Sequence, residues 1–188
     1  TTTTTAGGGG GGGGSCVAQQ SVTISVVTSG TPASTTFTNA DLGMQSIEIT
    51  SSASATNVIV TVKQSSRPAL APSPVSATGF VYKYLDITTT LNSSFITNTR
   101  IRFNVTKAWI AANKINAGTI ALNRLVGDAW VKLPTTKISE TNITINFEAV
   151  SPGLSIFVIT GSRSVTFFDV IAKIDDYYKG RTTFFDVI

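Results

Sequence analysis

The chain has 188 residues, of which 41% are hydrophobic and only 13% are charged, and it has no histidine. Threonine (30 residues) and serine (20 residues) take most of the polar positions, whereas a typical soluble domain has about 25% charged residues. A surface rich in hydroxyls and poor in charge is typical of secreted fibres, adhesins and glycoproteins rather than of cytosolic enzymes. The net charge of +4 comes from scattered lysines and arginines. No basic run alternates with aromatic residues, which disfavours nucleic-acid binding.

Residues 1–16, TTTTTAGGGGGGGGSC, form a low-complexity arm. The arm has no large apolar side chain to bury, and glycine loses more backbone freedom on ordering than any other residue, so this composition predicts a flexible tether. Cys16 is the only cysteine, which excludes an internal disulfide. A lipid anchor on Cys16 would need an apolar signal segment just before it. An incidental or intermolecular thiol is therefore the preferred interpretation.

Residues 17–161 contain short segments that alternate apolar and polar residues or are rich in β-branched residues, which is the pattern of strands. Nine segments have this pattern: 21–28, 45–50, 57–63, 79–87, 99–105, 118–125, 129–133, 141–150 and 154–160. Clusters of Gly, Pro, Asn and Ser separate them, and residues 67–79 are expected to form a proline-rich loop. At this spacing the segments predict an all-β fold, an antiparallel β-sandwich of about seven to nine strands.

One short helix is expected at 106–113, with Thr106 as its N-cap. We expect the large aromatic side chains of the sandwich to lie in its core: Phe103, Trp109, Trp130, Phe147 and Phe157. For the two tryptophans the alternative is a platform that binds sugar. Trp109 lies beside an isoleucine in the predicted helix and Trp130 begins a strand after a turn, so core packing is preferred.

Residues 162–188 have a different pattern, with apolar residues at helical spacing. Thr166 and Asp169 resemble a capping box, and the hexapeptide TFFDVI at 166–171 recurs at 183–188. A single amphipathic helix of this size cannot bury its aromatic face alone, so we expect this face to dock on the sandwich or on another subunit. The face consists of Phe167, Phe168, Ile171, Ile174 and Tyr178.

Three asparagines head Asn-X-Ser/Thr sequons: Asn92, Asn104 and Asn142. In an exported protein these are acceptors for N-linked sugar and lie at the surface. We expect all three to be exposed and at least one of them to carry a glycan, which would help to keep a charge-poor surface soluble.

The sequence offers little for catalysis. With no histidine and its one cysteine in the arm, the chain has no Ser–His or Cys–His nucleophile. A pair of acid–base carboxylates is conceivable among Asp86, Asp128, Glu140 and Glu148, but their positions on strands are typical of solvated or salt-bridged carboxylates. The acidic pair at 175–176 lacks the spaced oxygen ligands of a calcium loop. We therefore expect no enzymatic activity, no metal and no cofactor, and no apolar run is long enough to span a membrane.

A set of features occurs in a fixed order and spacing along three segments, 82–87, 99–135 and 147–161. These features are Ile101 to Val105 followed by Trp109 and Ile110, Asn113 to Ile115, Ile120 to Arg124, Trp130 with Leu133 and Thr135, and Phe147 to Ala149 leading into Ser151-Pro152-Gly153. Through these features roughly half of the chain, from about residue 79, resembles the PGF-pre-PGF domain of archaeal cell-surface (S-layer-associated) proteins. Leu154 departs from the family motif, which has phenylalanine there. The resemblance implies an exported archaeal surface protein with a β-sandwich, and it implies no catalytic residues.

The leading hypothesis is a structural subunit of an archaeal extracellular filament or surface layer, whose partners are copies of itself. Residues 1–28 would cross to the next subunit by strand exchange, with Val22, Ile24 and Val26 filling an open sheet edge there. The alternative is a cell-surface adhesin or binding module that recognises sugar or protein and uses its arm only as a linker. Both hypotheses place the protein outside the cell or at the cell surface.

Overall fold

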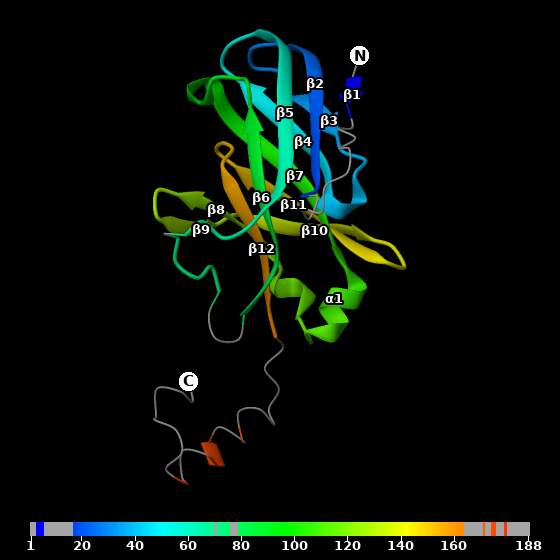
Figure 1. Cartoon of the computed structure of the whole chain (residues 1–188), viewed down its shortest axis with the longest axis vertical. Coiled ribbons are helices and arrows are strands. Elements are labelled where there is room, and N and C mark those ends of the chain that lie inside the picture. Colours follow the sequence, from blue (N-terminus) through cyan, green and yellow to red (C-terminus); the bar gives the residue numbers. More distant parts are fainter. Residues whose placement is uncertain are drawn as a thin grey trace, which may run out of the picture.

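The computed structural model describes most of the predicted sandwich and a few residues near the two ends. The described residues are 3–5, 17–69, 71–75 and 79–163, with Ile171, Ile174, Asp175 and Lys179 beyond them. Residues 3–163 of this set form two antiparallel β-sheets packed face to face, with one short α-helix at an end of the sandwich (Figure 1). The all-β sandwich predicted from the strand pattern is confirmed.

Sheet A has seven strands in the order β1-β2-β5-β6-β12-β8-β9, and sheet B has five in the order β10-β11-β7-β4-β3. The strands of sheet A are β1 (Thr3–Thr5), β2 (Gln19–Val27), β5 (Ala55–Ser65), β6 (Gly79–Thr89), β12 (Ile156–Ser162), β8 (Ala121–Val126) and β9 (Ala129–Lys132). Those of sheet B are β10 (Thr135–Glu140), β11 (Thr144–Ser151), β7 (Ile96–Thr106), β4 (Met44–Ser51) and β3 (Ala33–Thr36). Each strand runs antiparallel to its neighbours.

The connections tie the two sheets together. After β2, β4, β6, β7, β9 and β11 the chain passes to the other sheet, so neither sheet is built from one continuous stretch. Within sheet A, β2 and β12 are separated by β5 and β6, and each step is antiparallel. The start of β2 and the end of β12 therefore lie at the same end of sheet A (Figure 1).

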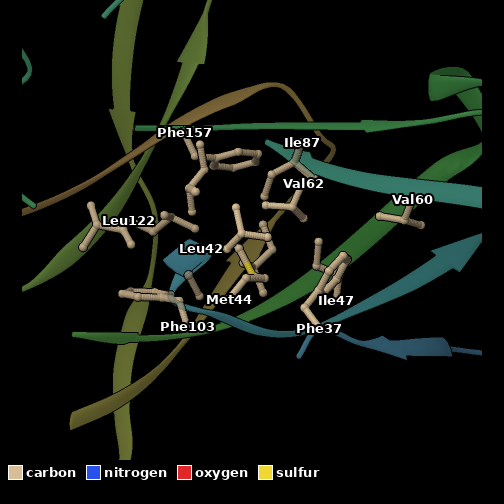
Figure 2. Close-up of a cluster of buried hydrophobic side chains, with 14 of the residues drawn as sticks. Phe37, Leu42, Met44, Ile47, Val60, Val62, Ile87, Phe103, Leu122 and Phe157 are labelled. Carbon is tan, nitrogen blue, oxygen red and sulfur yellow. The ribbon is translucent and has the colours of Figure 1, made fainter. Parts of the chain in front are cut away.

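Apolar side chains that alternate along the strands fill the space between the sheets. In β7, Ile101, Phe103 and Val105 are buried, and the residues between them face outward. Phe103 stacks on Phe147 of β11, with ring centres 5.5 Å apart. Phe157 enters the same core from sheet A (Figure 2). The expectation that these three phenylalanines are buried is confirmed.

The predicted short helix is also confirmed. Helix α1 (Lys107–Ala112) follows β7 directly, and the side-chain oxygen of Thr106 accepts a hydrogen bond from the backbone N–H of Trp109 at 3.3 Å. This bond satisfies one of the free N–H groups at the start of a helix. Three short 3-10 turns also lie between residues 40 and 119: η1 (Ala40–Leu42), η2 (Ser93–Phe95) and η3 (Ala117–Thr119).

The expectation that both tryptophans lie in the core is wrong, because each is only half-buried. Trp109 lies on α1, outside the two sheets, and its ring packs edge-to-face with that of Tyr82, with ring centres 5.0 Å apart. Trp130 lies on the edge strand β9, with its ring centre 6.0 Å from that of Tyr84. Its indole N–H donates to the backbone oxygen of Pro72 at 2.9 Å. Both rings therefore cover the ends and outer surface of the sandwich.

Each of the nine predicted segments overlaps an observed strand, and residues 19–162 contain two further strands. The additional strands are β3 (ASTT) and β10 (TTKISE). Both are edge strands whose polar sequences lack the apolar alternation by which a strand is recognised. The strand expected at 118–125 begins late, because η3 occupies its first residues.

We predict that Phe157→Ala lowers the free energy of unfolding by about 3–5 kcal/mol, because it leaves a cavity in a fully buried site. Phe95→Ala is the matched control, since the Phe95 side chain is 41% exposed. Urea titration followed by circular dichroism measures both variants, and equal losses would contradict the proposed core.

Candidate assembly interface

Strand β2 is the element that the sequence assigns to assembly, and the structure places it in its own sheet. It pairs with β5 from Gln19 opposite Lys63 to Val27 opposite Ala55. Residues 1–28 were expected to cross to another subunit, whereas in the single chain β2 pairs with its own β5. Val22 and Ile24 lie opposite Val60 and Val58, and all four are buried in the core.

The three candidate assembly residues of β2 have different surroundings. Val22 and Ile24 are buried in the core, with 1% and 8% of their surface exposed, whereas Val26 is 60% exposed. Two residues separate Ile24 from the next inward residue, Val27, so the alternation breaks and Val26 faces outward. Of the three, only Val26 can meet another molecule without removing β2 from the sheet.

Residues 3–5 of the N-terminal arm lie against the outer edge of β2. Strand β1 pairs antiparallel with β2, with Thr3 opposite Thr23 and Thr5 opposite Ser21. The residues between β1 and β2 include the glycine run. Strand β1 therefore pairs with residues 21–23 of β2 alone. The threonines at 3–5 add a strand to this edge of sheet A.

The other three sheet edges are less suited to strand addition. Strands β3 and β9 have four residues each. Strand β10 has a bulge between Lys137 and Ser139 and carries the exposed ion pair of Lys137 with Glu140, at 2.6 Å. Short strands, bulges and charges are the features that discourage edge-to-edge pairing. Strand β2 is longer, with nine residues, and β1 pairs with only three of them.

The sequon asparagines differ in exposure. Asn92 is exposed and caps η2, where its side-chain oxygen accepts hydrogen bonds from the backbone N–H and the hydroxyl of Ser94 at 3.0 and 2.9 Å. Asn142 is exposed between β10 and β11. Asn104 lies within β7, opposite Asn146, and is half-buried. The expectation of full exposure is confirmed for the first two and wrong for Asn104, because a position in a central strand is flanked by neighbouring strands on both sides.

The C-terminal aromatic face falls mostly outside the described residues. Ile171 and Ile174 are helical, in accord with the predicted spacing, and Ile171 is 44% exposed. Asp175 and Lys179 form an ion pair one helical turn apart. Phe167, Phe168 and Tyr178 lie outside the described residues, so the docking of this face stays a prediction.

The candidate carboxylates with charged partners are held in ion pairs on the outer side of sheet B. Glu148 accepts from Arg102 at 2.8 Å and from Arg100 at 3.3 Å. Glu140 lies 3.5 Å from Lys107 and also pairs with Lys137, and a hydrogen bond from Lys137 and the charges of both lysines hold the pKa of Glu140 below its ordinary value. Such contacts stabilise the ionised form and fit a structural role for these groups.

In the described part of the chain, no three His, Cys, Asp or Glu side chains gather closely enough to hold a metal ion. Within the same residues, no helix is both long and apolar enough to span a membrane. No family model, curated protein or solved structure matches this chain.

Two truncations separate the roles of the arm and of β2. Deleting residues 1–16 removes β1 and leaves the core intact, so we predict cooperative urea unfolding close to that of the full chain. Deleting residues 1–28 also removes the buried Val22, Ile24 and Val27, each worth about 1.5–3 kcal/mol of burial, and we predict loss of cooperative unfolding. A stable fold without residues 1–28 would contradict the placement of β2.

Proposed function

We propose that the chain is a structural subunit of an archaeal extracellular filament or surface layer, in which copies join by exchanging edge strands. The observation that supports this proposal most directly is the pairing of β1 with the outer edge of β2. An edge that accepts a three-residue strand from its own arm offers the same backbone groups to the arm of another copy. The exchange therefore needs no contact that a single chain does not already make.

The length of the tether favours exchange of the arm over exchange of β2. A glycine-rich tether over residues 6–18 has an average reach of roughly 20 Å, so β1 can pair with its own β2 or with the β2 of a copy whose edge lies within this distance. Withdrawing β2 would expose Val22, Ile24 and Val27, whereas withdrawing β1 breaks only a short strand pair. Exchange of β1 is thus the less costly route. A head-to-tail exchange that does not close produces a fibre.

The surface chemistry is consistent with a location outside the cell. Hydroxyl side chains replace charges over most of the polar positions, and two of the three sequon asparagines are exposed. We propose, on the resemblance described above, that the chain is related to the PGF-pre-PGF domain of archaeal surface proteins.

We predict that replacing Thr3, Thr4 and Thr5 together by proline abolishes filaments, because proline cannot donate a backbone hydrogen bond and is excluded from the middle of a sheet. The matched control replaces the same three residues by valine, which favours strands and should preserve filaments. Negative-stain microscopy of both proteins, with circular dichroism to verify folding, gives the answer. Filaments from the proline variant would overturn the arm-exchange proposal, and discrete dimers from the wild-type chain would indicate reciprocal exchange instead of a polymer.

A second prediction concerns sugar. We expect protein from its native host to exceed the 19.7 kDa of the bare chain, and Asn92→Gln and Asn142→Gln each to lower the mass by one glycan. Asn104→Gln is the internal comparison, since Asn104 is half-buried. Intact-mass spectrometry measures all three, and an unmodified native chain would remove this support for an exported protein.

The second candidate function is a cell-surface adhesin. The half-buried pair of Tyr84 and Trp130, with ring centres 6.0 Å apart, favours it because aromatic surfaces line many ligand sites. If this pair binds sugar, Trp130→Ala abolishes retention of the chain on polysaccharide beads and the control Phe95→Ala does not. Equal retention of both variants would dismiss the adhesin.

A further inference from the structure

Helix α1 is apolar on all of its sides, although it lies at the surface of the sandwich. After Lys107 its residues are Ala108, Trp109, Ile110, Ala111 and Ala112. A helix on the outside of a soluble protein normally has polar residues on its outer face, whereas a helix that is hydrophobic all round is a buried one. The sequence of α1 is therefore that of a covered helix.

The outer side of α1 is open in the single chain. Ala108, Ala111 and Ala112 are exposed, whereas Trp109 and Ile110 are half-buried and pack against the core. We refer to the surface of these five residues as the α1 face. Exposed apolar surface that continues along one element points to a contact with another molecule.

The C-terminal segment begins beside the α1 face. Strand β12 ends at the same end of the sandwich as α1 (Figure 1), and Arg163, the residue after β12, forms a bridge with Ile115. The Arg163 Nε donates to the backbone oxygen of Asn113 at 3.4 Å, and its guanidinium lies 4.6 Å from the ring centre of Phe80. These contacts fix the origin of residues 164–188 next to the end of α1.

The C-terminal segment has an apolar face that needs a partner. The described members of this face, Ile171 and Ile174, are helical, and Ile171 is 44% exposed in the single chain. A single amphipathic helix of this length gains most of its stability from packing and not from its own propensity. The exposure of Ile171 favours another copy, rather than the chain's own sandwich, as the surface that covers it.

The charges around the two faces are complementary. Lys114 and Arg163 are exposed near the end of α1, and within the described residues neither of them forms an ion pair. Residues 164–188 contain four aspartates against two lysines and one arginine. Opposite charges on two surfaces favour their association and fix its orientation.

We propose that the α1 face binds the aromatic C-terminal helix of a second copy, and that two copies exchange these helices reciprocally. Because the C-terminal segment begins at the same end of the sandwich as the α1 face, two copies that meet with these ends bring each helix to the α1 face of the other. The contact is isologous, since the same surfaces take part on both copies. It does not rest on the proposed exchange of β1, which uses the edge of β2.

Photo-cross-linking of the full chain tests this contact. Ile171→p-benzoylphenylalanine places the photoreactive group on the apolar face, and Lys173→p-benzoylphenylalanine, about 200° further round the helix, is the matched control. Chains labelled with heavy nitrogen and unlabelled chains are refolded together from urea, irradiated and digested with trypsin. Trypsin releases the α1 face as the peptide 108–114. This peptide is expected to be joined to the one that carries position 171, with labelled and unlabelled partners combined.

The labels decide which copy supplies the helix. Cross-links to 108–114 that join only chains of like label place the helix on its own α1 and overturn the exchange. Cross-links to other peptides alone, no cross-links, or equal yields from the Ile171 and Lys173 variants overturn the α1 face as the acceptor.

A charge on the α1 face gives a second test. Ala111→Glu alters an exposed position and repels the acidic segment, so the mixed-label yield is expected to fall at least tenfold while the circular dichroism spectrum is unchanged. Ala129→Glu, at an exposed position of β9, is the matched control and keeps the yield. An unchanged yield in Ala111→Glu overturns the proposal. The measurement detects a contact between two peptides and not a filament, so failure of the β1 exchange and failure of this contact are distinguishable.

Discussion

The contact between the inner faces of the two sheets is the interaction on which the rest of the structure depends. Phe103 and Phe147 from sheet B and Phe157 from sheet A meet in one core, and neither sheet could bury its apolar face without the other. Because the chain crosses repeatedly between the sheets, strands from distant parts of the sequence contribute to this one core. A strand such as β2 that contributes buried side chains is held firmly, whereas β1 adds only a short pairing at the edge.

In the proposed assembly, this difference between β1 and β2 makes β1 the segment that is exchanged. Hydrophobic burial makes β2 part of the fold, whereas β1 is held by a pairing of three residues. The candidate interface is therefore a backbone edge and not a pocket. Such an edge recognises main-chain groups, which explains why a low-complexity run of threonines can be sufficient as the incoming strand.

Much of the fold follows from local patterns in the sequence. The alternation in 99–105 and the N-cap at Thr106 both depend on neighbouring residues, and both elements are present. Strands β3 and β10 could not be recognised, because pairing with a neighbour and not their own composition makes them strands. The pairing of β2 with β5 and the hydrogen bond from the Asn104 N–H to the Gly43 oxygen depend on contacts between distant segments, which no local pattern encodes.

Strand β2 begins and strand β12 ends at the same end of sheet A. A pulling force applied at these two strand ends would load the first hydrogen bonds of β2 and the last ones of β12 in turn, so each strand would peel from its end. Peeling breaks a ladder bond by bond at low force, whereas shearing must break many bonds together. A subunit of this topology, pulled from that end, would yield and extend under tension.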